Sequence, residues 1–203
     1  MSKIISHNSW SYLPTKQLLL KPLSFIAKCQ EDDILVQLET VDGLDLRIRF
    51  DKYNRPVIAH GLIEYELNDI FNMIKLVDMT SYTRINKMNV EQDKINIRVL
   101  LETLPTMSKK ERKRQKELFS VFCSELVALN PNIVFWGGWP RDEWCKKVYD
   151  FGTKEPEVTE MHGSVSGNKL NCLSLKNWAE THNHEILTNC KTEYAMIDFI
   201  CFK

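Results

Sequence analysis

The chain has 203 residues, 43% of them apolar, and its 27 basic and 27 acidic side chains cancel to a formal net charge of zero. A chain of this size and composition folds around a core of its own, without disulfides or a structural metal to hold it. The neutral charge excludes the strong positive field of a dedicated nucleic-acid coat or membrane-surface protein. Any such partner has to be bound by a local patch.

The cysteines and the apolar runs indicate where the protein resides. Six cysteines lie at irregular spacing without a C-x-x-C pair, and the first residues lack the apolar stretch of a secretion signal. No apolar run approaches the roughly 20 residues that span a bilayer. We therefore expect a soluble, cytoplasmic protein with reduced cysteines that does not bind membranes.

The first third of the chain has the pattern of an antiparallel β-meander. Turn signals at Asp42-Gly43 and at 52–56 separate four expected strands at 23–29, 33–40, 44–51 and 56–66. In the third of these, apolar residues alternate strictly with Asp45, Arg47 and Arg49. This alternation predicts one buried face and one face in contact with water.

Helical and strand patterns then mix without a regular repeat. Helical spacing predicts a helix over 67–77, a polar connection follows it, and 95–102 is an expected strand. A helix should begin after Pro105, because Ser108 and Glu111 form a capping box, and it should end at Asn130-Pro131.

The last third continues in the same mixed way. We expect strands at 132–138, 169–175 and 194–202, with helices at 140–151 and 175–183 between them. This order favours an α+β fold, with an N-terminal antiparallel β-meander and a mixed C-terminal half. We expect one compact domain over 1–203, with a weak sub-division into a β-rich half (1–80) and a mixed half (95–203).

The periodicity also predicts which side chains form the core. Positions that alternate along the strands or repeat at helical spacing are expected to be buried. They are Leu46, Ile48, Phe50, Phe122, Leu126, Val134, Trp136, Ile197 and Phe199.

The stretch "VFWGGWPRDEWCKKVYDF" at 134–151 is the most unusual in the chain, because tryptophans surround a Gly-Gly pair and charged residues follow. We expect Gly137-Gly138 to break the strand, and a helix to begin near Pro140. Tryptophan and arginine at a surface corner are typical of interface hot spots. The candidate partner-binding residues are Trp139, Arg141, Asp142 and Trp144, and the alternative is that these bulky residues only anchor the corner.

A second candidate surface is the run "SKKERKRQKE" at 108–117, which precedes the apolar stripe of its helix. It is a candidate polyanion-binding face, a nuclear-import signal or simply a solvated helix face. Its basic residues are Lys109, Lys110, Arg112, Lys113, Arg114 and Lys116.

Histidines suggest a third possibility. His182, His184 and Cys190 lie close together, but without the ligand spacing of a zinc site, so we expect neither metal nor cofactor. Two His-x-Ser triplets, at 7–9 and 162–164, contain residue types that act as acid and base on a phosphodiester. Residues 6–11, however, are expected to be a flexible terminus.

Three functional hypotheses follow from these patterns. The leading one is a non-enzymatic protein that binds another protein, such as an inhibitor or immunity protein. The first alternative is a phosphodiester-cleaving or metal-assisted hydrolase that uses His162 with His182 or His184. The second is a nucleic-acid-binding module that uses the helix at 109–116.

Overall fold

The computed structural model describes residues 2–88, 94–141, 146–160 and 175–200. Its helices are η1 (Leu18–Ile26), α1 (Ile34–Gln37), α2 (Ile70–Met88), α3 (Lys109–Leu129) and α4 (Leu175–Asn189). Its strands are β1 (Lys3–Ser6), β2 (Gly43–Phe50), β3 (Pro56–His60), β4 (Ile63–Glu64), β5 (Asn96–Leu101), β6 (Val134–Pro140), β7 (Val158–Glu160) and β8 (Tyr194–Ile197).

The strands form one curled, mainly parallel sheet, with β2 near its centre. From one edge to the other, β6, β5, β2, β1, β8 and β7 pair in parallel. Only β3 and β4 are antiparallel, because a short turn joins β2 to β3 at Asp51–Arg55. The arrangement is a half-barrel of the α/β class, so the predicted α+β fold with an antiparallel meander is wrong.

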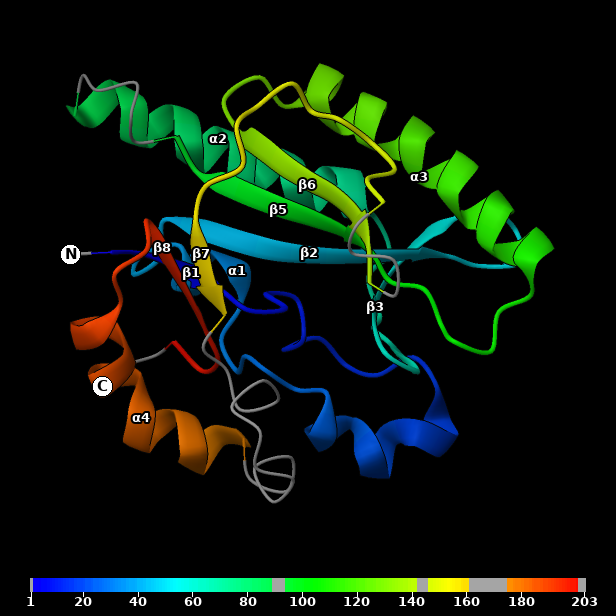
Figure 1. Cartoon of the computed structure of the whole chain (residues 1–203), viewed down its shortest axis with the longest axis horizontal. Helices are drawn as coiled ribbons and strands as arrows, with labels where there is room; N and C mark the ends of the chain where they lie inside the picture. Colours follow the sequence, from blue (N-terminus) through cyan, green and yellow to red (C-terminus); the bar gives the residue numbers. More distant parts are fainter. Residues whose placement is uncertain (1, 89–93, 142–145, 161–174, 201–203) are drawn as a thin grey trace.

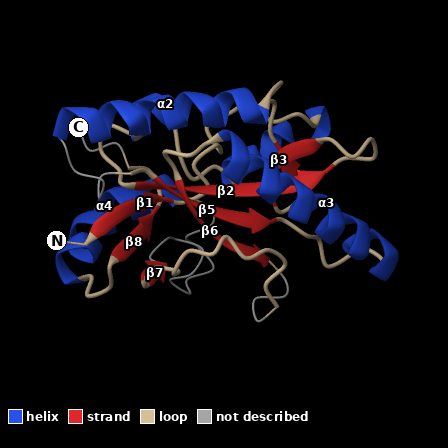
Figure 2. Cartoon of the chain, turned by 90° about the horizontal axis from the view of Figure 1, so that it is seen from above, coloured by secondary structure: helices blue, strands red, loops and turns tan. Residues whose placement is uncertain are grey.

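Helices lie above and below the strands in the view of Figure 1, where α2 and α3 are above β2 and β5, and η1 and α4 are below them. Figure 2, the view from above, shows α2 along one side of the sheet. The core between sheet and helices contains Leu46 and Ile48 of β2, Ile74 of α2, and Phe122 and Leu126 of α3. Alternation along β2 and helical spacing on α2 and α3 therefore turn these side chains toward one another.

Two segments that were predicted as strands are helical. Residues 23–29 fall largely in η1, which contains Pro22, and residues 33–40 contain α1. The Asp33 side chain accepts hydrogen bonds from the backbone N–H groups of Leu35 and Val36, which starts a helix in a stretch whose composition favours a strand. Helix α2 also extends into the segment that was predicted to be a polar connection.

The corner at 134–151 differs from its prediction as well. Strand β6 continues through Gly137 and Gly138 to Pro140, and residues 146–151 are not helical. Both glycines have positive φ, at 97° and 81°, and the pairing register with β5 shifts beside them. A Cβ on Gly138 would lie 2.2 Å from the Tyr149 carbonyl oxygen, so the close approach of the chain requires glycine.

Most of the predicted core is buried. Leu46, Ile48, Phe50, Phe122, Leu126, Trp136 and Ile197 are buried, whereas Val134 and Phe199 are only partly buried. Ser108 caps α3 as predicted, because its hydroxyl accepts from the Glu111 N–H at 3.1 Å, whereas the Glu111 carboxylate accepts from Arg114 and Gln115. Strands from both sides of residues 80–94 share the one sheet, and the domain organisation itself stays a prediction.

Phe122 tests the packing of α3 on the sheet. Its ring is buried and meets the rings of Phe50 and Phe71 at centroid distances of 6.1 and 5.3 Å. We expect Phe122→Ala to lower the free energy of unfolding by about 3–5 kcal/mol, because it leaves a cavity. The neighbouring Val121 is 59% exposed. Val121→Ala should change stability by less than about 0.5 kcal/mol in denaturant titrations, and equal effects of the two variants would contradict this packing.

Candidate active site

The polar face of β2 is buried. Asp45, Arg47 and Arg49 alternate with the apolar core residues as predicted, but all eight residues of β2 are buried, so the expectation of a water-exposed face is wrong. The polar face lies on the inner side of the curled sheet. Buried charges require partners. Arg47 finds one in Asp45 on the same strand, and Arg49 donates to the carbonyl of Gly61 after β3.

A histidine–aspartate pair lies beside Arg47. His7 follows β1 and Asp198 follows β8, and these strands are parallel neighbours. The carboxyl ends of parallel strands meet at one edge of a sheet. His7 Nδ1 therefore lies 2.6 Å from Asp198 Oδ1, with both side chains almost fully buried. The flexible terminus predicted at 6–11 is instead a buried turn.

Arg47 connects this pair to Asp45. Its Nε donates to Asp45 Oδ2 at 2.8 Å, and its terminal nitrogen lies 2.7 Å from His7 Nε2. An arginine only donates, so His7 Nε2 accepts and Nδ1 carries the proton toward Asp198. His7 is thereby held as a neutral imidazole with its lone pair directed at a guanidinium.

Electrostatics keeps the Asp45–Arg47 pair ionised. Burial alone favours the neutral form of Asp45, but Arg47, followed by Arg98, lowers the pKa of its carboxyl below the usual value. The Asn8 N–H also donates to Asp45 Oδ2 at 3.0 Å. Arg47 likewise loses hydration on burial, yet Asp45 and Glu102 raise the pKa of its guanidinium. The site therefore contains a permanent positive charge beside His7.

His60 completes the group. It ends β3, and its ring meets the ring of His7 edge to face with centroids 5.8 Å apart. His60 Nδ1 donates to the Ala27 carbonyl oxygen at 3.0 Å, which leaves Nε2 as an acceptor. Burial, followed by the charge of Arg47, lowers the pKa of His60 to about 3. His60 is thus neutral at pH 7, and it is only partly buried, so it marks the open side of the site.

Hydrogen bonds between segments hold the two strand ends in register. The Gln30 side-chain amide donates to the carbonyl oxygens of His7 at 3.1 Å and Ile197 at 3.2 Å. Asn183 of α4 donates to the Asp198 carbonyl oxygen at 2.9 Å. These buried amides fix the backbone on both sides of the histidine–aspartate pair.

A second charged cluster lies beside His60. Glu102, which follows β5 and is fully buried, accepts from the Gly61 N–H at 2.6 Å and from Arg141. Arg49 donates to the Gly61 carbonyl oxygen. Arg141, whose side chain is 40% exposed, also adds to the lowering of the His60 pKa. These hydrogen bonds fix the turn that follows His60. They also place Arg141 close enough to His60 to affect its pKa.

The predicted site residues are distributed over several places. Arg141 lies beside His60, and Trp139 is partly buried with its ring nitrogen 3.2 Å from the Glu155 carboxylate. Asp142 and Trp144, like His162, lie outside the described residues. His182 stacks on Trp178, and His184 is exposed on α4. Neither histidine belongs to the group around His7.

The basic run forms the start of α3. Arg112 donates to backbone carbonyls of the preceding turn, including that of Pro105, and Arg114 pairs with Glu111 at 2.6 Å. These two arginines therefore have structural partners, and Lys113 lies 3.8 Å from Glu117. Lys109, Lys110 and Lys116 share the same first turns. Their role in polyanion binding stays untested.

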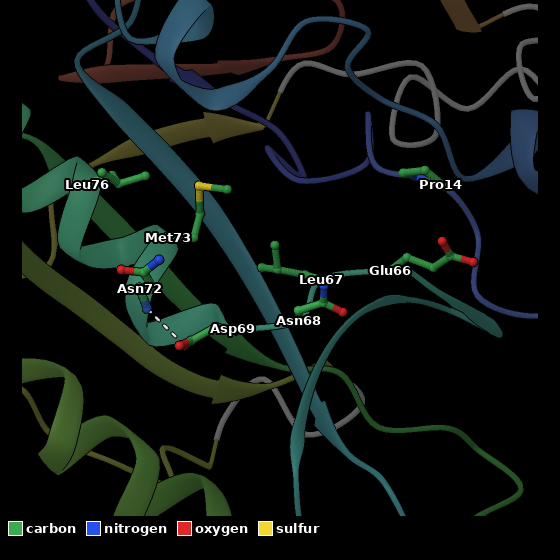
Figure 3. A pocket seen from close by; sticks show the side chains of 8 residues that line it. All are labelled: Pro14, Glu66, Leu67, Asn68, Asp69, Asn72, Met73 and Leu76. Carbon is green, nitrogen blue, oxygen red and sulfur yellow. Dashed lines mark hydrogen bonds between the residues drawn. The ribbon is translucent and has the colours of Figure 1, made fainter.

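A hollow between α2 and the N-terminal segment shares no residue with the histidine group. Figure 3 shows it between Asp69, Asn72 and Met73 on one side and Pro14 and Glu66 on the other. Its one drawn hydrogen bond, from the Asn72 N–H to Asp69 Oδ1 at 3.0 Å, caps α2. It contains no acid–base pair comparable to His7 and His60.

Comparison with known proteins supports the fold. No protein-family model and no curated protein matches the sequence. Structures of the phosphatidylinositol-specific phospholipase C of Staphylococcus aureus are similar over 99% of this chain and 86% of that chain. One, from work on its membrane binding, has a TM-score of 0.56 at 15% identity. A double mutant has a TM-score of 0.52 at 13% identity.

The low pKa of His60 gives the folded protein a defined pH dependence. The unfolded chain takes up a proton near pH 6.5, whereas the folded chain does so only near pH 3. Between these values the unfolded state binds more protons than the folded state. The contribution of neutral His60 to the free energy of unfolding is therefore fully present above pH 6.5, and it is lost as the pH falls toward 3. The loss is at most about 1.4 kcal/mol per pH unit.

His60→Asn isolates this contribution, because the asparagine amide still donates toward the Ala27 carbonyl. We expect its unfolding free energy to depend less on pH than that of the wild type between pH 6.5 and pH 3. His184→Asn controls for the loss of one imidazole from the chain. Parallel pH profiles for the wild type and His60→Asn would contradict the neutral state of His60.

Proposed function

We propose that the protein is a phosphodiester-cleaving enzyme that acts on the headgroup of a phosphatidylinositol-type lipid. The observation that carries the proposal is the pair of imidazoles, His7 and His60, which meet edge to face, with Arg47 bonded to His7. The enzymes of similar fold replace the leading hypothesis of a non-catalytic inhibitor that binds another protein, and also that of a nucleic-acid-binding module. The enzymes of similar fold favour the hydrolase alternative over the leading hypothesis, and we propose His7 and His60 for the roles given there to His162, His182 and His184.

Arg47 is the group that suits the phosphate. Its guanidinium is permanently charged and offers donors in a plane that matches two phosphate oxygens. In the protein without substrate, one of those donors is directed at His7 Nε2. A bound phosphodiester takes over that donor and frees the lone pair of Nε2 for the reaction.

His7 acts as the general base in this proposal. Its Nδ1 proton is held by Asp198, so Nε2 is the atom that removes a proton from the attacking hydroxyl. The imidazolium that forms is stabilised by the buried carboxylate of Asp198 and by the arriving negative charge on phosphorus. This division of roles follows the general logic of a base oriented by a carboxylate.

His60 acts as the general acid on the leaving oxygen. In the free protein burial, followed by the charge of Arg47, keeps it neutral, so it has to take up a proton before or during substrate binding. A phosphodiester anion between the two groups screens the charge of Arg47 and favours protonation of His60 Nε2. Substrate binding and activation of the acid are thereby coupled.

The helix η1 suits the approach to a lipid surface. None of its residues is buried, and Leu18 and Leu19 are 74% and 91% exposed, with Leu23, Phe25 and Ile26 also exposed. It ends directly before Ala27, whose carbonyl contacts His60. An exposed apolar segment beside a site indicates a binding surface, so we propose that η1 enters the lipid headgroup region. The expectation of no membrane contact is not retained.

The helices of the described residues do not cross a bilayer. None of them is both long enough and apolar enough to do so.

Substitutions of the two histidines and Arg47 test the reaction. We expect His7→Asn and His60→Asn to lower kcat/KM by about 10²–10⁴-fold, the usual contribution of a general acid or base. Arg47→Lys should cost about 10²–10³-fold, because the flat pair of donors is lost. The measurement is release of phosphorylated headgroup from phosphatidylinositol vesicles by the purified chain.

The matched control is His184→Asn, which removes an exposed histidine of α4. It should retain wild-type activity, and thermal melts should show that every variant is folded. Cleavage that survives in folded His7→Asn, or a folded wild type without activity, would contradict the proposed function.

The role of η1 has its own test. Leu19→Asp places a charge at the most exposed apolar position of the helix, so binding to anionic vesicles should weaken, as measured by co-sedimentation. Val121→Asp, at an exposed position of α3, is the control. Activity on a water-soluble headgroup phosphodiester should be equal in both variants. Equal vesicle binding by Leu19→Asp and the wild type would exclude η1 as the lipid-binding segment.

A further inference from the structure

A thiol lies beside the histidine–aspartate pair. Among the described residues, His7, Cys29 and Asp198 form the only group of three whose potential metal-ligand atoms all lie within 4.8 Å of one another. Each of the three is about 1% exposed. A nitrogen, a sulfur and an oxygen of these types are the ligands that Zn²⁺ binds in proteins.

The backbone fixes the thiol in this place. Cys29 accepts a 2.7 Å hydrogen bond from the Phe199 N–H, directly after Asp198, and the next residue, Gln30, bonds to the carbonyl of His7. The chain segments that carry the three side chains are therefore tied together. Cys29 Sγ has a contact of 3.6 Å to the Ala27 carbonyl oxygen and no disulfide partner.

We propose that His7, Cys29 and Asp198 form an inhibitory site for a thiophilic divalent cation such as Zn²⁺. Inhibition follows from the composition of the site, since the cation takes the side chain that the reaction needs as its base. This consequence rests on the proposed function, whereas the binding of the cation does not.

The distances allow such an ion after small movements. In a tetrahedral site with ligand distances near 2.0–2.1 Å, neighbouring nitrogen and oxygen ligands lie about 3.3 Å apart. His7 Nδ1 and Asp198 Oδ1 are 2.6 Å apart, so they have to separate slightly. The thiol has to approach, starting from a distance of at most 4.8 Å. A fourth position remains for a water molecule or another ligand.

Protons and charges balance. Burial, and then Asp198, raises the pKa of the Cys29 thiol well above its usual range, so the thiol is protonated in the metal-free protein. On binding, the thiol proton leaves to solvent and the proton of His7 Nδ1 moves to Nε2. One thiolate and one carboxylate then neutralise the dication, while Asp45 continues to neutralise Arg47.

Binding of the cation to His7 also affects Arg47. Once Nε2 carries the proton, it faces the donor group of Arg47, which lies 2.7 Å away in the metal-free protein. Two donors repel each other, so the guanidinium has to turn away from His7. The cation therefore removes both the general base and the arrangement of the phosphate-binding arginine.

Cobalt binding tests the site independently of activity. The experiment uses chains in which Cys145, Cys172 and Cys201, outside the described residues, are serine. Co²⁺ should bind one per chain and produce a thiolate-to-cobalt absorption band, and Zn²⁺ should displace it. Cys29→Ser should remove the band and weaken Zn²⁺ binding at least about tenfold. Cys190→Ser, at a partly buried thiol elsewhere, should change neither.

The second arm measures inhibition by Zn²⁺ as the ratio of cleavage rates with and without the ion. We expect this ratio to fall in the parent chain and to stay near one in Cys29→Ser. A parent chain without a thiolate–cobalt band, or a Cys29→Ser variant that binds and responds to Zn²⁺ equally, would overturn the proposal. Cobalt binding through Cys29 in a chain that cleaves no phosphodiester would keep the metal site and reject the proposed function instead.

Discussion

Arg47 has to carry its charge inside the sheet, and the arrangement around it follows from that requirement. A buried ion that loses its partner costs about 3–5 kcal/mol, so Asp45 on the same strand face is needed for stability as well as for charge balance. The guanidinium bonds to Asp45 and to His7 at 2.8 and 2.7 Å. Removal of Asp45 would leave the buried charge of Arg47 without compensation, whereas removal of the neutral His7 would leave one of its donors without an acceptor.

The pairing of the strands brings the other residues of the candidate site close to Arg47. Because β1 and β8 are adjacent and parallel, the residues that follow them converge, and Asp198 reaches His7. The end of β1 pairs with the start of β2, which places His7 near Asp45 and Arg47. Strand β3 runs antiparallel to β2 and so brings His60, at its end, back toward these residues. Both rings are held neutral, His7 by the donor geometry of Arg47 and His60 by its low pKa.

Local features of the fold could be predicted from the sequence, and long-range ones could not. The helix start capped by Ser108 and the apolar face of β2 depend on neighbouring residues, and both predictions were correct. Parallel pairing depends on distant segments, and an alternating strand has the same pattern whether its charged face meets water or a buried site. Arg47 therefore looked like a surface residue.

The candidate site could be predicted from the sequence only in part, for the same reason. His7 was recognised as a possible acid–base residue only in a pair with His162, and the hydrolase hypothesis used His162 with His182 or His184 instead. The usable signal was position: His7, His60 and Asp198 each lie at the end of a strand. That signal becomes informative only when the strands are known to be neighbours, and the antiparallel meander predicted for 23–66 concealed it.

The most direct test of the account is a crystal structure with a non-cleavable phosphonate analogue of the phosphatidylinositol headgroup. The account predicts that its phosphorus lies between the rings of His7 and His60, that Arg47 donates to its oxygens, and that the contact between Arg47 and His7 Nε2 is broken. An analogue bound elsewhere, for example at the basic start of α3, with the contact between Arg47 and His7 unchanged, would contradict it.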